Sequence, residues 1–179
     1  GIAVTVSDGV VISGNTVQYA SRSGIIIDRS DNCIIDGNIV KNSHQGGETG
    51  AKYQAGILLW AQVGVTADNN TIVNNRCFDD QTTPTQNYGI WIEGACDDNI
   101  IAHNNLLGNG ISGFGQSGMG SNNRIEGNKG YVTENEVSAD FSGTSIEIAH
   151  GLAGTPQYVW ASFNSTGYGE WTWTANSTH

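Results

Sequence analysis

A Gly-Ile pair recurs along the chain, and this repeat constrains the fold more than any other feature. The basic interval is a little over twenty residues, and two of the intervals are about ten residues longer. The pairs are Gly1-Ile2, Gly24-Ile25, Gly56-Ile57, Gly89-Ile90 and Gly110-Ile111. A period in this range is typical of a solenoid, in which each repeat buries its apolar face against the next.

A second signature, Ile-x-x-Asn, lies downstream of the Gly-Ile pair in most repeats. It occurs as Ile12-Ser13-Gly14-Asn15, Ile35-Asp36-Gly37-Asn38, Ile101-Ala102-His103-Asn104 and Ile125-Glu126-Gly127-Asn128, and its weakest match is Val73-Asn74-Asn75-Arg76. Asn tolerates tight-turn backbone conformations, and its amide both donates and accepts hydrogen bonds. We therefore expect the asparagines of successive repeats to stack as a ladder.

Apolar residues between the signatures alternate with period two, as in Ile25/Ile27, Ile57/Leu59 and Ile90/Ile92. This pattern predicts β-strands, and the absence of any sustained 3.6-residue apolar stripe argues against crossover helices. Short parallel strands without helices can stack only as a coil. The sequence therefore predicts an all-β fold with a parallel β-helix of about five coils over residues 1–133.

The Gly-Ile strands and Ile-x-Gly-Asn turns resemble the right-handed parallel β-helices of the pectin-lyase-like superfamily. That superfamily includes pectate lyases, polygalacturonases, mannuronan epimerases and phage tailspikes. The resemblance implies a right-handed helix, a polysaccharide partner, and an extracellular location, either secreted or on a virion surface. The catalytic motifs of these families are missing from the sequence, so no catalytic residue is carried over from them.

Residues two and four positions after each repeat glycine are expected to point outward, because alternate strand residues face opposite sides. The predicted outer rows are Ala3, Ile26, Leu58, Trp91 and Ser112, and Thr5, Asp28, Trp60, Glu93 and Phe114. Aromatic rings beside carboxylates are unusual for a merely solvated sheet. Trp60 and Trp91 are candidate platforms for sugar rings, and packing beneath loops is their alternative role.

Asp28 and Glu93 are the candidate acid and base. They are two coils apart with Trp60 between them, so their backbones are expected to lie roughly 10 Å apart. Inverting glycoside hydrolases hold their two carboxyl groups about 6.5 to 9.5 Å apart, which makes hydrolysis geometrically feasible. The alternative is that both are ordinary solubilising carboxylates.

The extra residues of the two longer repeats, roughly 42–55 and 79–88, are predicted to form loops that overhang this face and shape a groove. The first loop carries acid, base and cationic side chains. We place His44 and Lys52 among the catalytic candidates and Tyr53 among the substrate-binding ones, with a purely solvated loop as the alternative.

Charge and composition restrict the other partners. The formal net charge is −10, with only seven Lys and Arg, which argues against nucleic acid, and no stretch resembles a membrane span. No cofactor and no metal site is predicted. Calcium remains conceivable because turn aspartates supply hard oxygen ligands: Asp68, Asp79, Asp80, Asp97 and Asp98.

The Gly-Ile rhythm stops near Tyr131, and residues 134–179 are predicted to form a small antiparallel, β-sandwich-like module, either complete or continuing beyond His179. Trp171 and Trp173 alternate onto one face and are candidate sugar-binding residues, with core or interface packing as the alternative. Similar modules at the ends of β-helix and phage-tail proteins bind sugars or trimerise, so a homotrimer is one expectation.

Two functions are compatible with these features. The first is a carbohydrate-active protein that binds an extracellular polysaccharide, with cleavage as a hydrolase or lyase left open. The second is a non-catalytic, tailspike-like structural or adhesive fragment whose C-terminal module trimerises or binds glycans.

Overall fold

The computed structural model describes residues 1–133, 152–153, 159 and 174 of the chain. The chain divides into two compact units, Gly1–Tyr131 and Val132–His179. The predicted C-terminal module lies almost wholly outside the described residues, and both of its candidate tryptophans, Trp171 and Trp173, do. The strands that the structure describes all belong to the first unit.

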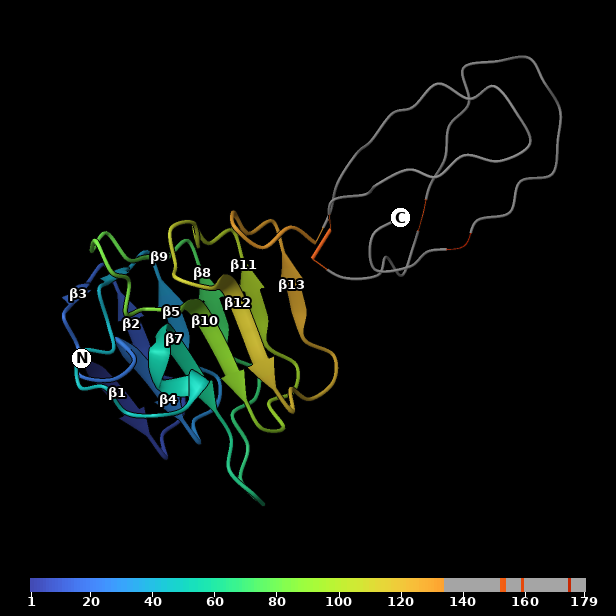
Figure 1. The fold of residues 1–179 in the computed structure, drawn as a ribbon. Coiled ribbons are helices and arrows are strands. Elements are labelled where there is room, and N and C mark those ends of the chain that lie inside the picture. Colours follow the sequence, from blue (N-terminus) through green and yellow to red (C-terminus); the bar gives the residue numbers. More distant parts are fainter. Residues whose placement is uncertain (134–151, 154–158, 160–173, 175–179) are drawn as a thin grey trace, which may run out of the picture. The chain divides into compact units, whose positions relative to one another are not determined.

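Short parallel strands build three sheets, as Figure 1 shows. Sheet 1 contains β1 (Ile2–Thr5), β4 (Ile25–Asp28), β7 (Ala55–Trp60), β10 (Tyr88–Glu93) and β12 (Ser112–Ser117). Sheet 2 contains β2 (Val11–Ser13), β5 (Ile34–Asp36), β8 (Thr71–Val73), β11 (Ile100–Ala102) and β13 (Arg124–Glu126). Sheet 3 contains β3 (Thr16–Gln18), β6 (Ile39–Lys41) and β9 (Arg76–Phe78).

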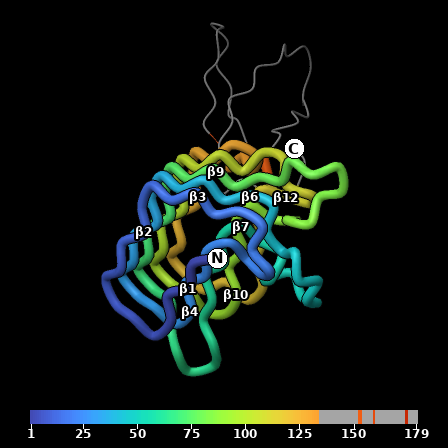
Figure 2. The backbone as a smooth tube through the Cα atoms, turned by 90° about the vertical axis from the view of Figure 1, so that its left-hand side faces the viewer, coloured from blue at the N-terminus to red at the C-terminus, as the bar shows by residue number. Residues whose placement is uncertain are grey.

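Each coil contributes one rung to each sheet in chain order, and the fourth and fifth coils extend sheet 3 through single bridges at Asn105 and Lys129. The predicted parallel β-helix of about five coils is confirmed. Figure 2 shows the successive coils nearly superposed, with the loop that follows β6 and the turn that follows β7 projecting beyond their common outline. The first of these contains a short 3-10 helix, η1 (Ala51–Gln54).

The core is a stack of inward-pointing aliphatic side chains, one or two from each rung. In sheet 1 the completely buried members include Ile25, Ile57 and Ile90, which pair in register from coil to coil. Sheet 2 supplies an equivalent row in which Ile35 and Ile72 pair directly. Stacking equivalent positions in this way gives every coil the same cross-section, which explains why the sequence repeats.

The repeat glycines form a column at the start of the sheet 1 strands, where backbone of the next coil leaves no room for a side chain. A Cβ on Gly56 would lie 2.8 Å from the carbonyl oxygen of Gly89, and one on Gly89 would lie 2.6 Å from that of Gly113. The glycines of the first four Gly-Ile pairs are therefore a steric requirement of stacking and carry no chemistry.

The predicted start of the fifth coil at Gly110-Ile111 is wrong. Phe114, not Ile111, pairs with Ile90, so the column glycine is Gly113. Phe114 is buried against the ring of Tyr131 with centroids 5.0 Å apart, whereas Ile111 is 64% exposed. The outer positions of this coil are consequently Gly115 and Ser117 rather than Ser112 and Phe114, because Trp91 and Glu93 pair with them.

The predicted asparagine ladder is confirmed at the turn that follows sheet 2. The backbone N–H and side-chain Nδ2 of Asn38 donate to Oδ1 of Asn75 over 2.9 and 3.0 Å, and Asn75 donates to Oδ1 of Asn104 in the same way. The third repeat matches the signature one residue earlier than predicted, as Ile72-Val73-Asn74-Asn75, because Ile72 is the residue that pairs with Ile101.

A second asparagine ladder stabilises the turn that precedes sheet 2. The backbone N–H of Asn70 donates to Oδ1 of Asn99 over 2.8 Å, and that of Asn99 donates to Oδ1 of Asn123 over 3.0 Å. Cys33 takes the equivalent place in the second coil, where its N–H donates to Oδ1 of Asn70. Cys33 is completely buried, as predicted for a core position.

Candidate functional site

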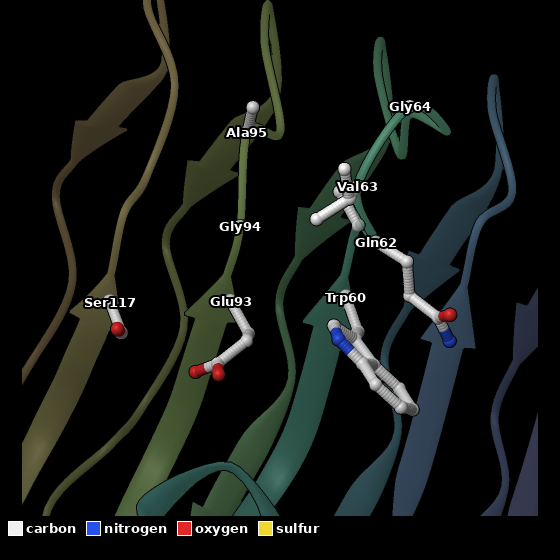
Figure 3. Close-up of a pocket in the computed structure, with 9 residues that line it drawn as sticks. Trp60, Gln62, Val63, Gly64, Glu93, Gly94, Ala95 and Ser117 are labelled. Carbon is white, nitrogen blue, oxygen red and sulfur yellow. The ribbon is translucent and has the colours of Figure 1, made fainter.

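Asp28, Trp60, Glu93 and Ser117 occupy one row across the outer side of sheet 1, at the carboxyl ends of adjacent strands. Asp28 pairs with Trp60, Trp60 with Glu93, and Glu93 with Ser117. The predicted stacking of residues some thirty positions apart in the sequence is thus confirmed for the first three. Figure 3 shows Trp60, Glu93 and Ser117 at matching heights on neighbouring strands.

An open cleft of about 680 Å³ lies at the end of this row. Its lining comes from the last residues of β7, β10 and β12 and from the turns that follow β7 and β10. The residues are Trp60, Ala61, Gln62, Val63, Gly64, Glu93, Gly94, Ala95 and Ser117. The cleft therefore combines one large aromatic ring with a carboxylate, an amide and a hydroxyl.

Glu93 is held from two sides. The indole Nε1–H of Trp91 donates to its Oε2 over 2.9 Å, and the ammonium of Lys52 lies 3.6 Å from its Oε1. The Glu93 side chain is nevertheless 27% exposed. A carboxylate with fixed orientation and an open edge is suited to binding hydroxyl or amine hydrogens of a ligand.

Lys52 reaches this row from the loop that follows β6. Its Nζ lies 4.2 Å from the ring centroid of Trp60 and 5.4 Å from that of Tyr53, within the range of cation–π attraction. The backbone carbonyl of Lys52 accepts a hydrogen bond of 2.6 Å from Oγ of Ser23. The structure therefore brings four predicted residues together: Lys52, Tyr53, Trp60 and Glu93.

Trp91 lies beneath this loop instead of facing solvent. It is 8% exposed and packs with Ala55 and Leu58 in a small apolar cluster outside the main core. Ala51 of η1 packs against this small cluster. The ring of Tyr88 lies 4.6 Å from that of Trp91. In this arrangement Trp91 supports the loop and orients Glu93, and Trp60 is the ring that lines the cleft.

Asp28 is nearly buried beside the cleft and is paired with its neighbour in sequence. Nε of Arg29 donates to Oδ1 over 3.0 Å and a terminal guanidinium nitrogen to Oδ2 over 2.9 Å. These hydrogen bonds raise the pKa of the Arg29 guanidinium above its ordinary value. The amide of Gln62 approaches Oδ1 at 3.5 Å, and the Asp28 side chain is only 10% exposed. The ion pair leaves little of this carboxylate for a ligand.

His44 serves the conformation of its own loop. Its Nε2 lies 2.7 Å from the carbonyl oxygen of Glu48, and its backbone has a positive φ of 66°. The Glu48 carboxylate pairs with Arg22 over 2.9 Å, and this hydrogen bond and charge lower the pKa of Glu48. The guanidinium of Arg22 also lies 5.1 Å from the ring of Tyr53.

The second longer repeat distributes its extra residues over two turns, and this differs from the prediction. Residues 61–70 join β7 to β8, whereas residues 29–33 suffice between β4 and β5. The projecting turn at Gln62 to Val65, closed by an antiparallel bridge, was not foreseen and supplies one wall of the cleft. The predicted loop 79–88 contacts the first loop, where Asn87 donates to Gln54 over 2.6 Å.

One of the comparisons with known proteins agrees with this geometry. The model of the family described as "Right handed beta helix region" matches residues 1–178. The chain belongs to this family. Neither the comparison with curated proteins nor that with solved structures gave a match. The family match runs across the boundary predicted at residue 133, so the separate C-terminal module remains a prediction.

Among the described residues, no group of three or more His, Cys, Asp and Glu side chains is arranged to hold a metal ion. Of the turn aspartates that could supply calcium ligands, Asp68, Asp79 and Asp97 accept from backbone N–H groups, as when Oδ1 of Asp68 accepts from the N–H of Asp97 over 2.7 Å. The Asp80 carboxylate accepts from the side chains of Lys41 and Asn42. No helix in the described part of the chain is long and apolar enough to span a membrane.

Proposed function

We propose that the protein binds an extracellular polysaccharide across the outer side of sheet 1. The observation that carries this proposal is the half-buried ring of Trp60 in an open cleft, one rung from the oriented carboxylate of Glu93. A sugar ring has apolar C–H faces that stack on an aromatic ring and hydroxyls that need hydrogen-bond partners. The Gln62 amide and the Ser117 hydroxyl are further polar groups of the cleft.

The arrangement of the row suits a chain-like ligand. Neighbouring rungs lie roughly 4.8 Å apart, so a polymer that crosses the strands meets a new side chain at each step. The resemblance to the pectin-lyase-like superfamily supports the same class of ligand. The location we propose with it, secreted or on a virion surface, is where such polymers occur.

The test is oligosaccharide binding by the purified protein, measured on a glycan array and then by calorimetry. Trp60→Ala should weaken binding about fivefold to a hundredfold, as expected for the loss of one stacking ring. The matched control is Tyr19→Ala, because Tyr19 is an aromatic residue that is 57% exposed elsewhere on the coil. The proposal would be refuted if the wild-type protein bound no glycan of the panel. It would also be refuted if Trp60→Ala and Tyr19→Ala weakened glycan binding equally.

Cleavage of the bound polysaccharide is a second candidate, favoured by the placement of Asp28 and Glu93 on either side of Trp60. The two residues are two rungs apart, with backbones roughly 10 Å apart, and inverting glycoside hydrolases hold their carboxyl groups about 6.5 to 9.5 Å apart. The Arg29 pair weighs against a direct role for Asp28. Release of reducing ends or unsaturated uronates should fall at least a hundredfold in Asp28→Asn and Glu93→Gln if the pair is catalytic. Absence of product from wild type leaves binding as the function.

A further inference from the structure

Two residues of the cleft, Trp60 and Glu93, already contact an ammonium group that the protein itself supplies. Nζ of Lys52 lies 4.2 Å from the Trp60 ring centroid, 5.4 Å from the Tyr53 ring centroid and 3.6 Å from Oε1 of Glu93. Two aromatic faces and one carboxylate around a cation form a cage of the kind that recognises ammonium groups. We name the three cage residues, Trp60, Tyr53 and Glu93, the ammonium cage.

We propose that the ammonium cage recognises the free amines of an amino-sugar polysaccharide, and that Lys52 is an internal occupant which the ligand displaces. This inference rests on the proposed function, since it names the class of sugar that the same face binds. The sugar ring lies against Trp60, where Nζ of Lys52 now lies over the indole ring. Its ammonium takes the place of Nζ beside Glu93.

The attachment of Lys52 permits such a displacement. The 3-10 helix η1 that carries it contains no buried residue, and the preceding Gly50 gives it no side-chain cap. The backbone at Lys52 stays anchored through the bond from Ser23, so only the side chain has to leave. The ion pair with Glu93 is long at 3.6 Å, and partly exposed pairs of this kind contribute little stability.

Charge favours a cationic ligand over an acidic one. The chain has a formal net charge of −10, which attracts polycations and repels polyanions. Once Lys52 has moved aside, the charged group left in the cage is the Glu93 carboxylate. A uronate would place a second carboxylate against it, whereas a glucosamine unit places an ammonium there.

The experiment compares three hexamers by calorimetry in a mildly acidic buffer that keeps glucosamine protonated: glucosamine, N-acetylglucosamine and glucose. Wild type should bind the glucosamine hexamer about three to thirty times more tightly than the other two. Lys52→Met keeps an apolar stem and removes the competing ammonium, so it should bind the glucosamine hexamer at least about threefold more tightly than wild type. Glu93→Gln keeps an acceptor for Trp91 and should lose the preference.

The matched control is Lys41→Met. Lys41 also pairs with a carboxylate, Asp80 at 2.9 Å, and lies 5.6 Å from the Phe78 ring centroid, but on sheet 3. Its substitution should leave all three affinities unchanged. Thermal unfolding of each variant verifies that the coil is intact.

The other outcomes separate this inference from the proposed function. Equal affinity of wild type for the three hexamers overturns the amino-sugar assignment and leaves polysaccharide binding standing. Unchanged or weaker glucosamine binding by a folded Lys52→Met variant overturns the role of Lys52 as occupant. If a lysine hexapeptide competes as strongly as the glucosamine hexamer, the cage recognises ammonium groups of protein ligands, and the proposal is refuted. Binding of none of the three hexamers by wild type or Lys52→Met refutes the amino-sugar assignment, and the glycan array decides polysaccharide binding separately.

Discussion

The indole Nε1–H of Trp91 donates a hydrogen bond to Oε2 of Glu93 over 2.9 Å, from two residues earlier on the same strand. Residues two apart on a strand point to the same side, so the buried ring reaches the rim of the cleft through its polar edge. The apolar cluster beneath the first loop and the polar row of the cleft therefore form one connected structure. A change in the buried part is expected to alter the exposed part.

Trp91→Phe tests this connection, because it keeps an aromatic ring in the cluster and removes the N–H donor. We expect a loss of about 1 to 2 kcal/mol in the free energy of unfolding, since a hydrogen bond to a charged group is lost and some volume with it. Urea denaturation measures the loss. The affinity of the variant for the glucosamine hexamer, or for another glycan that the wild type binds, should fall as well, because Glu93 is no longer oriented. Unchanged stability together with unchanged affinity would show that the bond does not orient Glu93.

The glycine column makes a sharper prediction about stability. In Gly56→Ala the new Cβ meets the Gly89 carbonyl at 2.8 Å and Cys77 Cβ and Gln86 Nε2 at 3.0 Å, so whole coils must move apart. We expect a loss of about 3 kcal/mol or more. Gly9→Ala is the control, because its φ of +66° is strained for alanine but no atom lies within 4 Å, and it should cost about 1 to 2 kcal/mol. Thermal unfolding that ranks the two variants the other way would contradict the steric role of the column.

Most of the coil could be predicted from the sequence because its constraints are local and repeat. Gly24, Gly56 and Gly89 each come directly before the inward isoleucine that pairs in register, and alternation then assigns the other inward residues. The predicted start of the fifth coil is wrong for a physical reason. Phe114 replaces the usual isoleucine, so the pair Gly110-Ile111 resembled the signature more closely than Gly113-Phe114 did. A ring packed at a tilt against that of Tyr131 fills the core as an aliphatic side chain does.

The asparagine ladder predicts unequal effects along its length. Asn75 is buried, accepts from both nitrogens of Asn38, and donates to the carbonyl of Ile35 over 2.8 Å. Asn75→Ala should cost about 3 to 5 kcal/mol, because several buried polar groups lose their partners. Asn15→Ala, at the half-exposed end of the ladder, should cost about 1 kcal/mol. Urea denaturation midpoints measure both, and equal losses would refute the cooperative ladder.

The site was predicted less completely than the fold, because its geometry depends on loops. The row of Asp28, Trp60 and Glu93 follows from the repeat alone. The burial of Trp91 under η1 and the position of Lys52 over Trp60 depend on how residues 42–55 pack, and no periodicity governs that segment. The turn at Gln62 was missed because the extra length of its repeat was assigned wholly to residues 79–88. The Val63-Gly64 dipeptide was its only local signal.

The loop that carries Lys52 makes stability depend on pH through Glu48. Its carboxylate accepts from Nε of Arg22 over 2.9 Å, and this bond lowers the pKa of Glu48 in the folded protein. A lowered folded-state pKa means that the unfolded chain binds the proton more readily. The stabilisation is therefore present above the unfolded pKa of about 4.3 and is lost as pH falls through the lower folded value. In thermal melts, wild type should exceed Glu48→Gln in Tm near neutral pH, and the difference should shrink toward pH about 3. A difference that stays constant or grows on acidification would contradict the Arg22 pair as its source.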